Sequence, residues 1–170
     1  ANQAYAAAKL GGKVSMIGAV GSDAFGPMLR RNLESVGVNC TGIATSTRAT
    51  GVAAITVIPD GGNTILVSPG ANHDLPVDRT LELLQTALEP GSLMLCQLEI
   101  PMPVISAALE TARARGAQSM LDPAPAPSGG TFDRRLLELT DIVTPNQTEI
   151  ALLLGGRPAD EPRTVTDAIE

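Results

Sequence analysis

Aromatic residues are nearly absent from this sequence, whose 170 residues include no Trp, one Tyr and two Phe. Proteins that bind single-stranded nucleic acid stack its bases on aromatic rings, and this chain has no such platform. Basic residues are also in the minority, with 12 Lys and Arg against 18 Asp and Glu and a formal net charge of −6. An acidic chain without blocks of positive charge has no electrostatic footprint for nucleic acid or anionic lipid. We therefore expect neither nucleic acid nor a membrane as a partner.

Cysteine is scarce as well. Cys40 and Cys96 stand apart without C-x-x-C spacing, which predicts free thiols in a reducing compartment. No apolar run approaches the roughly 18 residues that a transmembrane helix needs. These features together predict a cytoplasmic protein.

Aliphatic residues are abundant instead, since 44% of the chain is hydrophobic. A core of Ala, Val, Ile and Leu suits an α/β layer fold. From residue 92 onward strand-like and helix-like patterns alternate, with strands expected at 92–99, 117–123 and 141–145 and helices at 101–116, 132–140 and 146–156. This alternation predicts a parallel sheet with right-handed crossovers.

The first half of the chain is less regular. Helices are expected at 1–10, 24–37 and 76–88, with a buried strand at 13–20. Two β-branched runs at 51–58 and 63–69 surround "PDGG" and predict a hairpin. We expect this hairpin, at about 51–68, to be a small lid inserted in a single domain spanning 1–170. Both ends of the chain fall within helical patterns, so we expect a fragment of a longer protein.

Polar residues follow several predicted strands at their carboxyl ends, where open parallel sheets bind ligands. These residues are Asp23, Glu99, Asp122, and Asn146 with Glu149. Each also has a structural alternative, such as a helix cap for Asp23, a favourable helix dipole for Glu99 or a turn for Asp122. Spacing alone favours a capping box for Asn146 and Glu149. The two roles are compatible, because a helix N-terminus also attracts anions.

Common phosphate-binding and hydrolase motifs are missing. The sequence has no complete P-loop, no G-x-G-x-x-G after a strand and no G-x-S-x-G. A phosphate site in this protein must therefore have another design.

Several segments resemble the ribokinase (PfkB-like) family of carbohydrate kinases nearly end to end: "ANQAYAAAKLG", "MIGAVGSDAFG", "TGVAAITV", "SPGAN", "QLEIP", "LDPAPAP" and "DIVTPNQTE". The resemblance implies an α/β ribokinase-like three-layer fold, with a mostly parallel central sheet flanked by helices and a small β-sheet lid. It implies ATP-dependent phosphorylation of a sugar hydroxymethyl group, most closely D-ribose to D-ribose 5-phosphate. A kinase for another pentose, deoxyribose or a nucleoside, or a non-catalytic sugar-binding module, stays open.

The resemblance also implies roles for individual residues. Asn2 and Glu99 would hydrogen-bond the sugar hydroxyls, and Asn146 would contact the ATP phosphates. Glu149 would act on Mg²⁺ through water, and K⁺ would be an activator bound outside this chain. The lid sheet would pair two copies into a homodimer.

The sequence departs from the family pattern in three ways. No residue here matches the catalytic base, an Asp that we expect beyond Glu170 together with the anion hole, the adenine pocket and the K⁺ loop. We therefore expect this chain alone to be inactive. Gln147 stands where relatives often have Glu, and Asp122 stands in the sugar site where ribose-specific members often have Asn.

Overall fold

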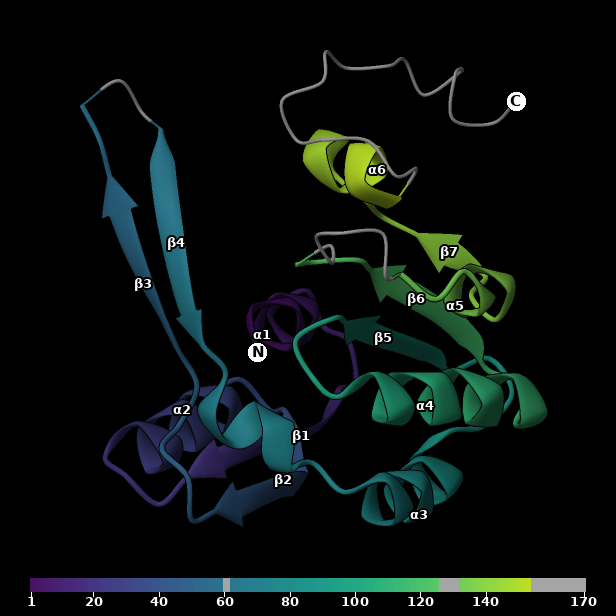
Figure 1. Ribbon diagram of the computed structural model, residues 1–170. Helices are drawn as coiled ribbons and strands as arrows, with labels where there is room; N and C mark the ends of the chain where they lie inside the picture. The colour runs from purple at the N-terminus through teal and green to yellow at the C-terminus, as the bar shows by residue number, and fades with distance from the viewer. Residues whose placement is uncertain (60–61, 126–131, 154–170) are drawn as a thin grey trace. The chain divides into compact units, whose positions relative to one another are not determined.

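The computed structural model describes residues 1–59, 62–125 and 132–153 (Figure 1). The chain divides into two compact units, Ala1–Leu83 and Leu84–Glu170, with helix α3 (Val77–Ala87) crossing the boundary. Among the described residues, no helix is long and apolar enough to cross a membrane. That the two units form a single domain stays a prediction.

The first unit contains a parallel pair of strands. Its elements are α1 (Asn2–Lys9), β1 (Ser15–Gly21), α2 (Phe25–Glu34) and β2 (Asn39–Ser46). In the β1–β2 register, Gly18 lies opposite Ile43. Leu33, Val38, Cys40 and Ile43 form the buried cluster that joins α2 to β2. Strand β2 was not among the predicted elements.

Arg30 fixes α2 against β2. Its guanidinium donates from Nη1 to the Cys40 carbonyl at 2.8 Å and from Nη2 to the Ile43 carbonyl at 2.5 Å. A hydrogen bond from a charged donor to a backbone carbonyl is strong. Arg30 therefore fixes the position of α2 along the length of β2.

Both cysteines are free and buried, which confirms the prediction of unpaired thiols. Burial raises the pKa of Cys96 to about 12. Burial, and then the nearby Glu34 carboxylate, also raise the pKa of Cys40. The thiolate is the reactive form, so both residues pack as small apolar groups.

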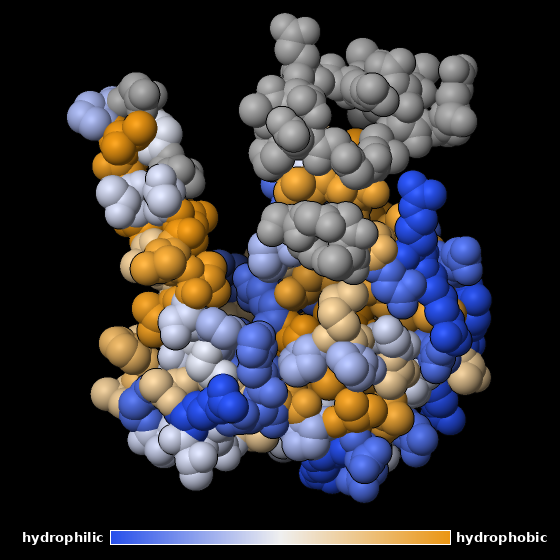
Figure 2. Space-filling view, viewed as in Figure 1, coloured by the Kyte–Doolittle hydropathy of each residue, from blue (hydrophilic) through white to orange (hydrophobic). Residues whose placement is uncertain are grey.

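The predicted hairpin is present. Strands β3 (Val52–Val57) and β4 (Asn63–Ser68) pair antiparallel, with Ile55 opposite Ile65. The 3₁₀ helix η1 (Gly70–Asp74) follows. Every residue of β3 is exposed, and Figure 2 shows hydrophobic residues along much of the hairpin, with more polar ones between them. Its role as a lid stays a prediction.

The hairpin has two unlike faces, because successive residues of a strand point to opposite sides. The pairs Ala53–Val67 and Ile55–Ile65 share one face, which is apolar over both pairs. The pairs Ala54–Leu66 and Thr56–Thr64 share the other, which is mixed. Ile65 is 52% exposed, so the apolar face is left uncovered within the first unit.

The second unit has the predicted β-α-β-α-β-α order: β5 (Leu93–Gln97), α4 (Met102–Ala114), β6 (Gln118–Asp122), α5 (Arg135–Glu138), β7 (Ile142–Val143) and α6 (Gln147–Leu153). The three strands form a parallel sheet in the order β5-β6-β7. The expected helix near Thr164 and most of the loop "PAPAPSGG" lie outside the described residues.

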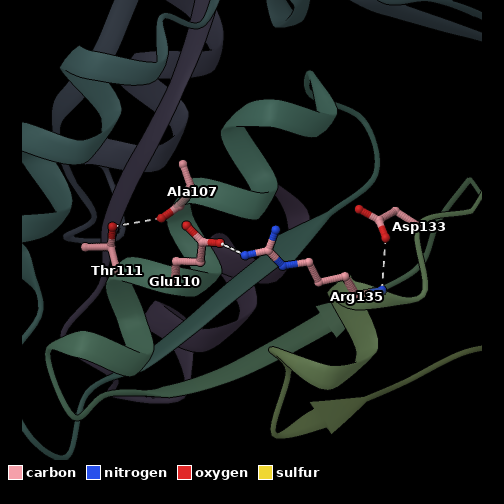
Figure 3. A network of polar contacts seen from close by, with 5 residues as sticks. All are labelled: Ala107, Glu110, Thr111, Asp133 and Arg135. Atoms are coloured by element: carbon pink, nitrogen blue, oxygen red, sulfur yellow. Dashed lines mark hydrogen bonds and ion pairs between the residues drawn. The ribbon is translucent and has the colours of Figure 1, made fainter.

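Helix α4 supplies a large part of the second unit's core. The residues that it buries recur at helical spacing: Val104, Ile105, Ala108, Leu109 and Ala112. On its exposed side, Glu110 accepts a hydrogen bond from Arg135 at 2.6 Å, and Asp133 caps the Arg135 backbone N–H at 3.0 Å (Figure 3). These contacts hold α5, which precedes β7 in the chain, beside α4.

Candidate functional site

The carboxyl ends of β5, β6 and β7 meet at one edge of their sheet. The register places Gln97 beside Asp122 and Leu121 beside Val143. Backbone hydrogen bonds continue past the strands, from Leu98 N–H to the Ala124 carbonyl at 3.0 Å. Because the strands are parallel and in register, the segments carrying Glu99, Asp122 and Asn146 leave the sheet at the same edge. The predicted gathering of polar residues there is confirmed for the second unit.

Glu99 lies in the bend between β5 and α4 and is exposed. Pro101 occupies the N-cap of α4, and no side chain caps this helix. Within the part of the chain that the structure describes, the Glu99 carboxylate accepts no hydrogen bond. It is therefore open to a ligand, and the helix-dipole alternative for Glu99 stays a prediction.

Asn146 and Glu149 form a reciprocal cap at the start of α6. Asn146 Oδ1 accepts from the Glu149 N–H at 2.9 Å, and Glu149 Oε2 accepts from the Asn146 N–H at 2.8 Å. The Asn146 side-chain amide donates to Glu149 Oε1 at 2.7 Å. The capping box that the spacing favoured is thus confirmed. Glu149 is buried, with 9% exposure, so these contacts fix its carboxylate.

The cap leaves capacity for a ligand. Asn146 keeps one side-chain N–H, and each Glu149 oxygen keeps lone pairs beyond the one that it uses. No group of three or more His, Cys, Asp or Glu that could hold a metal occurs in residues 1–59, 62–125 or 132–153. A cation at Glu149 would therefore need water or phosphate oxygens to complete its shell, which is the usual arrangement for Mg²⁺.

Asn2 is the first residue of α1, in the first unit, and is exposed. It borders a hollow of about 360 Å³ whose other lining residues are Ala1, Tyr5, Leu29, Asn32 and Leu33. Two amide side chains on an otherwise largely apolar wall can orient a small polar ligand.

Asp23 caps α2, as expected, by accepting hydrogen bonds from the N–H groups of Phe25 and Gly26 at 3.1 and 3.2 Å. It has a second set of contacts that the sequence did not predict. Thr50 donates to it from its hydroxyl at 2.6 Å and from its N–H at 2.7 Å. These two contacts are the main reason why the pKa of Asp23 is lowered from its ordinary value of 3.8.

Two glycines allow this close approach. A Cβ on Gly21 would overlap the backbone of residues 48–50, and one on Gly26 would overlap the Gly21 carbonyl. The glycines of "GAVGSDAFG" therefore serve the junction between β1, α2 and the start of the hairpin. No spacing rule connects Asp23 with a residue 27 positions away, so sequence patterns could not reveal the contact.

A family model described as "pfkB family carbohydrate kinase" matches residues 1–170. The chain is 37% identical over 169 residues to the ribokinase of Haemophilus influenzae, covering 99% of this chain and 54% of that protein. It is 38% identical over 159 residues to a deoxyribokinase of Salmonella typhi, covering 91% of this chain and 50% of the relative. It thus spans about half the length of these relatives.

A solved structure gives the same result for the fold. The structure of Arabidopsis thaliana ribokinase complexed with ribose and ATP matches with a TM-score of 0.78 and 28% identity, over 99% of this chain and 54% of that one. The predicted ribokinase-like α/β fold is therefore confirmed.

Proposed function

Because the chain belongs to the pfkB family of carbohydrate kinases, we propose that the protein containing it transfers the γ-phosphate of ATP to a sugar hydroxymethyl oxygen. D-ribose is the proposed substrate and D-ribose 5-phosphate the product. The observation that carries the proposal is the shared carboxyl edge of β5, β6 and β7, which bears Glu99, Asp122 and Asn146. Ligands of open α/β sheets bind at this edge. The likeness to ribokinases supports ribose.

Glu99 and Asn2 are the proposed sugar-binding residues. Glu99 is exposed, and its carboxylate can accept hydrogen bonds from two hydroxyls. Asn2 can both donate and accept. Such groups discriminate strongly against an analogue that lacks the matching hydroxyl, because they are then left unpaired.

Asn146 and Glu149 are the proposed residues for ATP and Mg²⁺. The remaining Asn146 N–H would donate to a phosphate oxygen, and Glu149 would hold a water of the Mg²⁺ shell. When bound, Mg²⁺ would offset the negative charge of the phosphates, and K⁺ would be a further activator. The cap fixes both side chains before ligand arrives, so little reorganisation is needed on binding.

The hairpin is the proposed lid and dimer contact. Its apolar face is exposed within the first unit, and large exposed apolar patches are typical of interaction surfaces. Pairing with a second copy would bury that face.

A second candidate substrate is 2-deoxyribose, which the likeness to a deoxyribokinase favours. Asp122 at the sheet edge, where ribose-specific members often have Asn, is consistent with altered recognition of one hydroxyl.

A substrate panel on the complete gene product tests the proposal. ADP release would be measured with ATP, Mg²⁺ and, in turn, ribose, 2-deoxyribose, arabinose, fructose and adenosine. We expect the highest kcat/KM with ribose, at least about tenfold above the others. A preference for 2-deoxyribose would make 2-deoxyribose the proposed substrate in place of ribose. The absence of turnover with all five compounds would favour a non-catalytic sugar-binding module.

A further inference from the structure

The base of the hairpin carries a compact set of hydrogen bonds. Thr50 lies just before β3 and is only 6% exposed. Its hydroxyl donates to Asp23 Oδ1 at 2.6 Å and accepts from the Gly21 N–H at 2.9 Å, while its own N–H donates to Asp23 Oδ2 at 2.7 Å. We name Gly21, Asp23 and Thr50 the latch. It joins the end of β1 to the chain that enters β3.

The other leg of the hairpin is also held by a carboxylate. Asp74, at the end of η1, accepts a hydrogen bond from the Ser46 hydroxyl and pairs with Arg48 Nε at 3.0 Å. The Ala71 N–H donates to the Ala49 carbonyl at 2.9 Å. Both legs are therefore attached to the end of β2 and the segment that follows it. Helix η1 also packs against β1, and the latch adds hydrogen bonds that join the first leg to β1 and to the turn before α2.

The body of the hairpin contrasts with its base. All residues of β3 are exposed, and so are Ile65, Leu66 and Val67 in β4. Side-chain packing along the strands therefore contributes little to the direction in which the hairpin projects within the first unit. Contacts at the base, which are the hydrogen bonds and the packing of η1 with its buried Ala71, therefore set that direction.

We propose that Asp23 and Thr50 are positioning residues for the sugar kinase reaction, acting by holding the hairpin in the orientation that sugar binding requires. This inference rests on the proposed function of the hairpin as a lid. Neither residue needs to contact the sugar or ATP. Their effect would appear in sugar binding, because a lid that is free to swing must be ordered again at every binding event.

The chemistry of the latch suits this role. The hydrogen bonds from Thr50 lower the pKa of Asp23, so the carboxylate is ionised at neutral pH and accepts on both oxygens. One carboxylate holds the first turn of α2 and the hairpin at the same time. The latch consequently couples the hairpin to a helix whose Leu33 is in the core of the unit.

Thr50→Val removes the hydroxyl and keeps the shape of the side chain, whereas Thr50→Ser retains a hydroxyl at this position. Thr80→Val is the matched control, because Thr80 is 4% exposed and its hydroxyl donates to the Pro76 carbonyl at 2.7 Å in α3, away from the hairpin. All variants would be made in the complete gene product. Sugar KM, ATP KM and kcat would be measured well below each melting temperature, together with hydrogen exchange of the β3 and β4 amides.

We expect Thr50→Val to raise the sugar KM about tenfold, with kcat and ATP KM changed less than about twofold. Hairpin amides should exchange about tenfold faster. Thr50→Ser should restore both values, and Thr80→Val should change neither, even where it lowers the melting temperature.

Equal effects of Thr50→Val and Thr80→Val on the sugar KM would overturn the inference, as would faster hairpin exchange with an unchanged sugar KM. If the wild-type protein phosphorylates no sugar, the proposed function fails, and the exchange data then decide the latch alone. In that case, faster hydrogen exchange of the hairpin amides in Thr50→Val but not in Thr80→Val would support the latch. Unchanged exchange in Thr50→Val would rule the latch out.

Discussion

Asn146 and Glu149 are joined by three hydrogen bonds, of which two end on different oxygens of the Glu149 carboxylate. The geometry of the pair is that of a helix cap, whereas the family resemblance implies a phosphate and metal site. These roles do not compete, since a cap spends only part of the hydrogen-bonding capacity of either side chain. Substitutions that preserve the cap can therefore separate structure from catalysis.

Glu149→Gln provides that separation. Gln also closes a capping box: its oxygen can accept from the Asn146 N–H, although its amide nitrogen cannot accept from the Asn146 side chain. The melting temperature should therefore fall less than in Glu149→Ala. The lost charge should lower kcat by roughly 10–100-fold and raise the Mg²⁺ concentration needed for half-maximal rate, as for groups that act on a metal through water. Glu149→Ala should in addition cost about 1 kcal/mol of stability by removing the cap. Wild-type kinetics in Glu149→Gln would leave Glu149 with the capping role alone.

Glu99→Ala should raise the sugar KM by about tenfold or more, because hydroxyls of the bound sugar lose their acceptor. Stability should change little, since the carboxylate is exposed and accepts no hydrogen bond in the described part of the chain. The matched control is Glu89→Ala, another exposed glutamate of the second unit that lies beyond α3. Initial-rate kinetics at saturating ATP measure both. An unchanged sugar KM in Glu99→Ala would remove Glu99 from the site.

A substitution on the apolar face of the hairpin should dissociate the proposed dimer. Ile65→Lys places a charge on the face that Ile55 and Val67 share, and burying an unpaired charge is unfavourable. We expect a weakening of at least about tenfold in sedimentation velocity experiments. Thr64→Lys adds the same charge to the opposite face and should leave the dimer intact. A monomeric wild type, or equal effects of both changes, would contradict this contact.

Asp141 gives a prediction for acid stability. Its carboxylate accepts from the Ser119 N–H at 2.7 Å and from the Ser119 hydroxyl at 3.0 Å, and these bonds lower its pKa from the ordinary value of 3.8. A lowered folded-state pKa stabilises the protein above the unfolded value, and this contribution disappears as the pH falls through the folded-state pKa.

Asp141→Asn keeps an acceptor for Ser119 and cannot titrate. Its melting temperature should therefore fall less than that of the wild type between pH 6 and pH 3. Thermal unfolding followed by circular dichroism at several pH values measures the difference. Parallel curves for the two proteins would show that Asp141 does not contribute.

Alternating patterns were sufficient to predict the second unit. Each of its strands is short and has apolar residues at its centre, each helix begins near a polar or proline residue, and the alternation of strands with helices favours a parallel arrangement. Placement of Glu99 and Asn146 at one edge followed from that topology, because parallel strands share their carboxyl ends.

The first unit was harder to predict. Strand β2, "NCTGIATS", carries a glycine and four polar side chains with hydroxyl or amide groups, so its apolar alternation is weak. It exists because Cys40 and Ile43 are buried beneath α2, which is a tertiary effect. The contacts of Asp23 with Thr50, and of Asp141 with Ser119, join residues 27 and 22 positions apart, and no local rule reaches that far.

The latch also limits how freely the hairpin could be exchanged between related proteins. Because α2 and the hairpin share one carboxylate, a hairpin grafted from a relative would need a hydroxyl and a backbone N–H at position 50 to be received here. A graft that brought Pro to this position would leave Asp23 bound to the helix alone, and one that brought Val would keep only the backbone N–H contact. Natural variation at positions 23 and 50 should then be correlated, although the two residues belong to different segments of the chain.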